Sequence, residues 1–167
     1  MRRLFVLFFL ALTGCVAIPE GLSVVKPFDA SRYTGQWYEI MRLDHSFERG
    51  LSKVSATYTA NPDGTIKVLN RGYNAAKGKW QEAEGVAKFV GERDVGALKV
   101  SFFGPFYGSY NIIALDPDYQ WSLVAGPDRN YLWLLARTPT LPFETRERLI
   151  KQAKELGFAV ETLQEGQ

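Results

Sequence analysis

The chain has 167 residues, 46% of them hydrophobic and 23% charged, and its formal net charge is +2 at pH 7. Two of the basic residues, Arg2 and Arg3, precede an apolar N-terminal run; without them the basic and acidic side chains balance. A balanced chain has no net field that favours nucleic acid or an anionic partner. A single cysteine forms no disulfide within the chain, so core packing alone must stabilise the fold.

The first residues predict an export signal. Arg2 and Arg3 are followed by an apolar run from Leu4 to Leu12, which is shorter than the roughly 20 residues that span a bilayer. The stretch Leu12-Thr13-Gly14-Cys15 resembles the bacterial lipobox. We therefore expect a lipoprotein signal peptide over 1–14 and lipidation at Cys15. The alternative is an ordinary signal peptide with an incidental cysteine.

The signal also bears on the destination of the chain. Val16 follows Cys15, where aspartate would resemble a retention signal for the inner membrane. We therefore expect a lipid anchor in the bacterial outer membrane, with the domain facing the periplasm. Acyl chains on Cys15 would anchor the protein without spanning the bilayer.

The remainder predicts one all-β domain. Residues 15–28 contain Pro19, Gly21 and Pro27 and are typical of a tether, which places the domain at 29–167. From Gly35 onward, short β-rich runs alternate with turn residues about every ten positions, the pattern of a barrel or sandwich. Eight strands are expected, at 36–44, 52–60, 65–74, 79–90, 96–103, 108–115, 119–125 and 130–137.

One helix follows the strands. Apolar residues fall on one helical face between Pro142 and Leu156, and Gly157 suits the position after the helix end. A final run from Phe158 suggests an edge strand. The fold class is therefore an eight-stranded antiparallel barrel with one C-terminal helix packed outside.

Alternation along the strands predicts the interior. Val54, Ala56 and Tyr58 lie opposite the polar positions of their strand, and Asn70 faces inward from the next. Ala83 and other small residues share the inner faces. An eight-stranded barrel either fills with side chains or holds one small ligand, and both readings remain open at this point.

Three short motifs together resemble the lipocalin family. Gly35 and Trp37 begin the first strand, the run 114–119 reads ALDPDY between strands six and seven, and Leu134 to Arg137 end strand eight. The runs 42–58, 97–111 and 126–140 look most like the bacterial outer-membrane lipocalins, a group related to apolipoprotein D.

This resemblance implies an up-and-down barrel that is closed at one end. Gly35, Trp37 and Arg137 would close it, with the guanidinium over the indole ring. The open mouth would be edged by residues 44–50, the turn near Lys77 and residues 104–107. The ligand-binding positions that match are Tyr58, Asn70 and Trp133, and Tyr131 and Leu135 share a face with Trp133.

The resemblance further implies a lipid-binding lipoprotein that is not an enzyme. A fatty acid or lysophospholipid would bind in the barrel for storage or transport, in envelope maintenance under stress, and a homodimer is a possible assembly. No cofactor or metal is expected. Two alternatives remain: a structural envelope lipoprotein, and a lipid-modifying enzyme that uses His45, which we expect to be an ordinary histidine of a surface loop.

Overall fold

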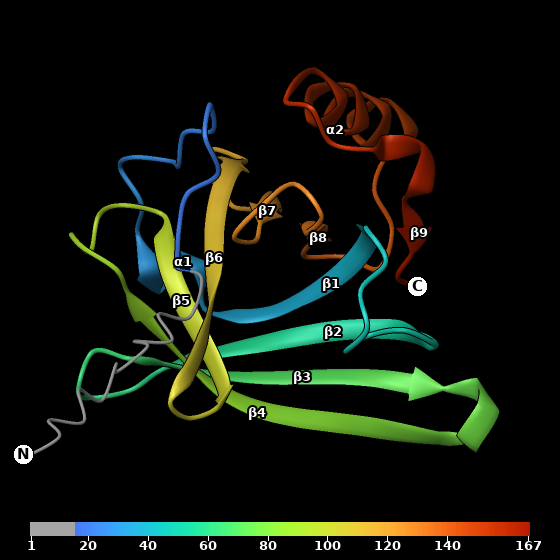
Figure 1. Cartoon of the computed structure of the whole chain (residues 1–167), viewed down its shortest axis with the longest axis horizontal. Coiled ribbons are helices and arrows are strands. Elements are labelled where there is room, and N and C mark those ends of the chain that lie inside the picture. The colour runs from blue at the N-terminus through green and yellow to red at the C-terminus, as the bar shows by residue number, and fades with distance from the viewer. Residues whose placement is uncertain (1–15) are drawn as a thin grey trace, which may run out of the picture.

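The computed structural model describes residues 16–167 and shows an antiparallel barrel (Figure 1). Residues 1–15, which include the expected signal peptide and Cys15, lie outside the described part. The strands are β1 (Gly35–Arg42), β2 (Leu51–Ala60), β3 (Ile66–Asn74), β4 (Lys79–Phe89), β5 (Ala97–Phe103), β6 (Phe106–Leu115), β7 (Trp121–Ala125) and β8 (Leu132–Ala136), followed by a short β9 (Gln164–Glu165). The eight predicted strands are confirmed, with ends displaced by a few residues.

Neighbouring strands pair in chain order from β2 to β8, and β1 pairs with both β8 and β2, which closes the barrel. The up-and-down order puts alternate loops at opposite ends. The open mouth is formed by the β1–β2, β3–β4, β5–β6 and β7–β8 connections; β3 and β4 extend furthest and are joined by the 3-10 turn Ala75–Lys77 (Figure 1). The short helix α1 (Ala30–Tyr33) lies at the other, closed end.

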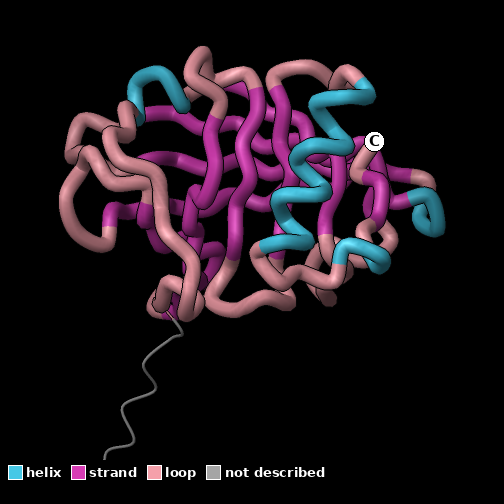
Figure 2. The backbone as a smooth tube through the Cα atoms, turned by 90° about the horizontal axis from the view of Figure 1, so that it is seen from above, coloured by secondary structure: helices cyan, strands magenta, loops and turns pink. Residues whose placement is uncertain are grey.

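The helix α2 (Phe143–Glu155) crosses the outside of the barrel (Figure 2). Leu149 and Ala153 are buried against outward-facing residues of β1, β7 and β8, and so form a second core outside the barrel. Gly157 has a φ of +88° just after the helix end, a backbone conformation that glycine adopts without steric strain. The predicted outer helix is confirmed.

The C-terminal residues close a gap between β1 and β2. These strands pair only between residues 35–38 and 55–58, while Gly166 donates to the carbonyl of Ile40 and accepts from the N–H of Val54. The expected short strand after the helix is present as β9, but it lies later than the run from Phe158, because Val160–Thr162 form a 3-10 turn. The turn redirects the chain from α2 to this gap.

Residues 17–28, which we call the N-terminal strap, lie along the barrel wall rather than forming the loose tether suggested by their composition. The N–H of Val25 donates to Ile112 and its carbonyl accepts from Gly96. Leu22 and Phe28 are buried in the outer and inner cores, respectively. The strap therefore belongs to the folded domain.

Candidate functional site: the barrel interior

The closed end of the barrel is built around Trp37, which is fully buried. The Arg137 guanidinium lies 3.9 Å from the centroid of the Trp37 ring. It donates to the carbonyls of Arg32, Gln36 and Tyr119 over 2.7–3.2 Å. Burial lowers the pKa of Arg137, but these acceptors satisfy its charge. Together the two side chains seal the barrel bottom.

A group of three tyrosine hydroxyls lies above this seal. The hydroxyl of Tyr110 is 2.9 Å from both that of Tyr33 and that of Tyr58. Tyr33 also donates to the Ser122 hydroxyl, at 3.1 Å. Burial raises the pKa of Tyr33 to about 12 and raises those of Tyr58 and Tyr110 as well. These hydroxyls therefore stay neutral and form a hydrogen-bonded floor above the closed end.

The interior is less tightly covered toward the mouth. The inward-facing residue Ala83 is exposed, although it lies on the inner face of β4 opposite Asn70. The inward positions around it are only half-buried: Ala56, Asn70, Val100, Phe102, Tyr110 and Trp133. Ala83 lies on the part of β4 that runs toward the mouth beyond its pairing with β5, which covers only Val86–Phe89. Solvent therefore reaches this inner wall from the mouth side, and the half-buried positions around it are mainly apolar.

A buried charged cluster lies in the mouth half of the barrel. Arg42 is 2% exposed and donates to the Glu39 carboxylate at 2.6 Å. It also donates to the backbone carbonyls of Glu48 and Leu51. The Glu48 carboxylate accepts from the indole N–H of Trp133 at 3.0 Å and lies 2.9 Å from Nε2 of His45. The carboxyl groups of Glu39 and Glu48 thus both interact with the Arg42 guanidinium.

The two carboxyl groups differ in pKa because their partners differ. Burial, together with the nearby Glu48 charge, raises the pKa of Glu39 to about 8 despite the Arg42 contact. Burial also opposes ionisation of Glu48, but the contacts with His45, Trp133 and Arg42 outweigh it and lower its pKa. Glu48 therefore ionises at a lower pH than Glu39.

Four rings surround this cluster at the mouth. His45 stacks on Phe47 with 3.8 Å between ring centroids and lies 5.2 Å from the Trp133 ring. Tyr131 lies 6.2 Å from Trp133 in a stacked arrangement. The expectation that His45 is an ordinary surface-loop histidine is wrong: the side chain is buried, because the β1–β2 loop folds it against Phe47 and Glu48.

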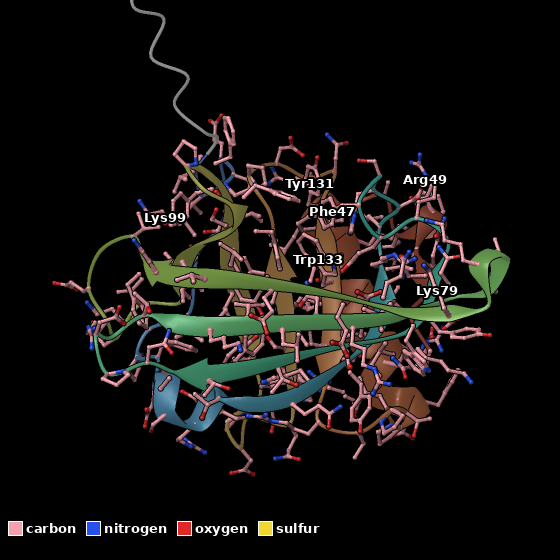
Figure 3. All side chains as sticks on the ribbon, turned by 90° about the horizontal axis from the view of Figure 1, so that it is seen from below. Phe47, Arg49, Lys79, Lys99, Tyr131 and Trp133 are labelled. Atoms are coloured by element: carbon pink, nitrogen blue, oxygen red, sulfur yellow. The ribbon has the colours of Figure 1, made fainter. Side chains whose placement is uncertain are left out.

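The residues expected to bind ligand all contribute to the barrel interior or its mouth, but at different depths. Tyr58 and Leu135 belong to the inner core near the floor. Asn70 is the middle residue of β3. Trp133 and Tyr131 lie next to each other and to Phe47 of the β1–β2 mouth loop (Figure 3). Gly35, which has a φ of +96°, begins β1 beside Arg137. The structure thus groups Trp133 with Tyr131, and Tyr58 with Tyr110.

Sequence reasoning missed the charged cluster. Alternation from Trp37 does place Glu39 on the inner face of β1, so that signal was available. Arg42 was hidden because a register shift between Glu39 and Met41 reverses the alternation. Glu48 lies in a loop, where no periodicity indicates direction.

Other features of the described residues do not suggest a different site. A cavity of about 440 Å³ lies outside the closed end, between the strap and the β6–β7 turn. Within residues 16–167, no group of three or more His, Cys, Asp or Glu side chains is arranged to hold a metal ion. The same residues include no helix long and apolar enough to cross a membrane.

Comparison with known sequences gives consistent matches over this fold. The model of the lipocalin-like domain family matches residues 28–167. The chain is 56% identical to outer membrane lipoprotein Blc of Citrobacter freundii over 145 residues, covering 87% of this chain and 82% of that protein. It is 52% identical to the Blc lipoprotein of Vibrio cholerae over 160 residues, covering 95% and 94%. Rat apolipoprotein D is 33% identical over 133 residues, covering 73% and 67%.

Solved structures agree on the fold. The cockroach allergen Per a 4 superposes with a TM-score of 0.71 at 16% identity and covers 90% of this chain and 94% of its own. Insecticyanin from the tobacco hornworm Manduca sexta also gives 0.71, at 17% identity, and covers 90% and 86%. At such low identity these likenesses concern the barrel alone.

Proposed function

Because the chain belongs to the lipocalin family, we propose that it binds fatty acids or lysophospholipids inside the barrel and stores or transports them. The close relatives are outer membrane lipoproteins, and the chain is a protein of the bacterial outer membrane. It is a binding protein and not an enzyme, which removes the alternative of catalysis by His45.

The observation that carries the proposal is the division of the interior into an apolar and a charged part. Toward the closed end the walls are formed by aliphatic and aromatic residues such as Val68, Leu98 and Leu135. Toward the mouth lie Arg42 and Glu48. An acyl chain would lose its contact with water along the apolar walls, which contributes about 25 cal/mol per Å² of buried apolar area. Its polar end would remain at the mouth.

The charged cluster suits a zwitterionic or anionic head group. Nε of Arg42 is buried without a hydrogen-bond partner within the described part of the chain and could donate to a ligand oxygen, while the Glu48 carboxylate could accept from an ammonium group. Nδ1 of His45 has no hydrogen-bond partner within the described part of the chain, although it is buried. A polar group of the ligand at the mouth could pair with it, in keeping with the rule that buried polar atoms are paired.

The remaining parts of the proposal concern the cell envelope. Lipidation at Cys15 after removal of residues 1–14 would anchor the domain on the periplasmic side of the outer membrane. Envelope maintenance under stress and a homodimer also belong to the proposal, supported by the resemblance. A deletion strain that grows like its parent under envelope stress would contradict the role in envelope maintenance. A monomeric mass in solution would contradict the homodimer.

The first experiment is a lipid titration of the chain starting at Val16, so that the strap is retained. Lysophospholipid and free fatty acid are added separately, and the quenching of the four tryptophans is followed. Saturable one-to-one binding supports the proposal and ranks the head groups. A folded protein that binds neither would favour a structural envelope lipoprotein instead.

A further inference from the structure

We propose that the open mouth of the barrel faces the membrane that holds the anchor and that its loops dock on the phospholipid surface. This orientation rests on lipidation of Cys15, which is part of the proposed function. Three observations support it: the course of the strap, the positions of the exposed aromatic residues, and the distribution of charge between the two ends of the barrel.

The strap runs from the mouth to the closed end. Near its beginning, the N–H of Ala17 donates to the hydroxyl of Ser109 at 2.7 Å, and its carbonyl accepts from Asn111 at 2.9 Å. The same Asn111 amide reaches the carbonyl of Gly126 in the β7–β8 mouth loop. At the other end of the strap, Phe28 donates to Asp94 in the β4–β5 loop of the closed end. The early strap is therefore fixed near the mouth.

Chain length then limits where an anchor can lie. Cys15 precedes Ala17 by two residues, which span at most about 7 Å. Along β6, Ser109 is three residues from Phe106 at the mouth and six from Leu115 at the closed end, or about 10 and 20 Å. A lipid on Cys15 would therefore be held on the mouth side of the domain, because only two residues separate Cys15 from Ala17.

Exposed aromatic side chains gather at this same end. Phe103 and Phe106, which are 80% and 65% exposed, flank the β5–β6 connection. Phe47 is 60% exposed on the β1–β2 loop and lies beside Tyr131 (Figure 3). Trp80 is exposed where β4 leaves the β3–β4 turn. Large apolar side chains held in water on adjacent loops mark a surface that binds apolar material.

Charged side chains are also distributed unevenly between the mouth and the closed end. The exposed basic residues of the mouth outnumber the exposed acidic ones, which are Asp44, Asp128 and, on the early strap beside Arg129, Glu20. The basic side chains of the mouth loops and their flanks are Arg49, Lys53, Lys77 and Lys79, and Arg49 and Lys79 are visible in Figure 3. The late strap, α1 and the loops of the closed end carry six acidic side chains, namely Asp29, Asp63, Glu92, Asp94, Asp116 and Asp118, against four basic ones, namely Lys26, Arg32, Arg93 and Arg137. An anionic phospholipid surface attracts the basic end and repels the acidic end.

The test compares two positions on the full lipidated protein in vesicles of phosphatidylethanolamine and phosphatidylglycerol. Because lipidation occupies the only native cysteine, Phe103→Cys and Asp118→Cys each introduce one free thiol, at the mouth and at the closed end. Each thiol carries an environment-sensitive fluorophore, and spin-labelled lipids act as quenchers. We expect quenching at position 103 to be several-fold stronger than at position 118.

Vesicle flotation separates the two proposals. Protein that does not float with the vesicles contradicts the anchor, and with it the basis of this inference. Protein that floats but shows equal quenching at both positions, or stronger quenching at 118, overturns the orientation and leaves the anchor intact.

A matched pair of variants tests the role of the phenylalanines. With the fluorophore on Ser46→Cys in the β1–β2 mouth loop, Phe103→Ser combined with Phe106→Ser should reduce quenching. Phe143→Ser removes an equally exposed phenylalanine, 76% exposed, from α2 on the barrel exterior and should leave quenching unchanged. Equal effects of the two changes would contradict docking through the β5–β6 hairpin.

Discussion

The guanidinium of Arg137 covers the ring of Trp37 and donates to three backbone carbonyls that surround it. The carbonyls belong to α1, β1 and the β6–β7 turn, so the Arg137 side chain joins the start of the barrel to a turn more than eighty residues later in the chain. Trp37 in turn donates from its indole N–H to the carbonyl of Tyr33 at 2.8 Å. These contacts hold the closed end together, which supports a structural role for Trp37 and Arg137.

Trp37→Ala should lower the free energy of unfolding by about 3–5 kcal/mol, because it removes a fully buried indole and leaves a cavity beneath Arg137. Urea unfolding followed by circular dichroism measures the change. Trp80→Ala, at an exposed position, serves as the control and should change stability by less than about 1 kcal/mol. Equal midpoints for wild type and Trp37→Ala would contradict the role assigned to the closed end.

Trp133→Ala should weaken acyl-lipid binding at least about tenfold, equivalent to roughly 1.4 kcal/mol, while the barrel stays folded. The indole is half-buried at the mouth, and its loss also removes the donor that holds Glu48. Displacement of a fluorescent fatty acid measures the affinity. Trp133→Phe keeps an aromatic ring but loses the N–H donor, so its affinity should lie between those of the wild type and Trp133→Ala. Unchanged affinity in folded Trp133→Ala would exclude this residue from the site.

The charged cluster predicts an unusual pH dependence of stability. Because the folded protein raises the pKa of Glu39 from 4.5 to about 8, it retains a proton that the unfolded chain releases in this interval. The free energy of unfolding should therefore fall as pH rises from about 5 to about 8. Glu39→Gln lacks this proton and should show a flatter profile by urea unfolding at each pH. A variant with the wild-type slope would show that Glu39 is not responsible.

Tyr110→Phe should lower the free energy of unfolding by about 1–3 kcal/mol, since it leaves the buried hydroxyls of Tyr33 and Tyr58 without a shared partner. Thermal unfolding measures the effect. Tyr107→Phe makes the same chemical change on the same strand, where the ring contacts Lys88 and Lys99 outside the barrel, and should be nearly neutral. Similar losses in both variants would argue against a special role for the tyrosine floor.

The strands and the outer helix were predictable because their signals are local. Val54, Ala56 and Tyr58 alternate with polar neighbours, and Gly157 marks the helix end. The inward direction of Tyr58 and Asn70 followed from the same alternation. These features depend on residues close together in the chain, which a sequence records directly.

The features that the sequence did not predict depend on contacts between residues that are distant in the chain. Arg42 faces inward only because a register shift interrupts β1, and His45 is buried only because its loop folds onto Trp133 and Glu48. The strap was predicted to be a tether because Pro19 and Pro27 are typical of a linker, whereas its hydrogen bonds to the barrel wall involve residues distant in the chain. None of these outcomes has a periodic signature.

The bonds of Gly166 to Ile40 and Val54 have a consequence for how the protein is made. Gly166 is synthesised more than a hundred residues after Ile40 and Val54, and contacts between residues so far apart form slowly. A chain whose last residues have not yet been synthesised therefore lacks the backbone that joins the mouth halves of β1 and β2. Until those residues are in place, the barrel remains open between these two strands.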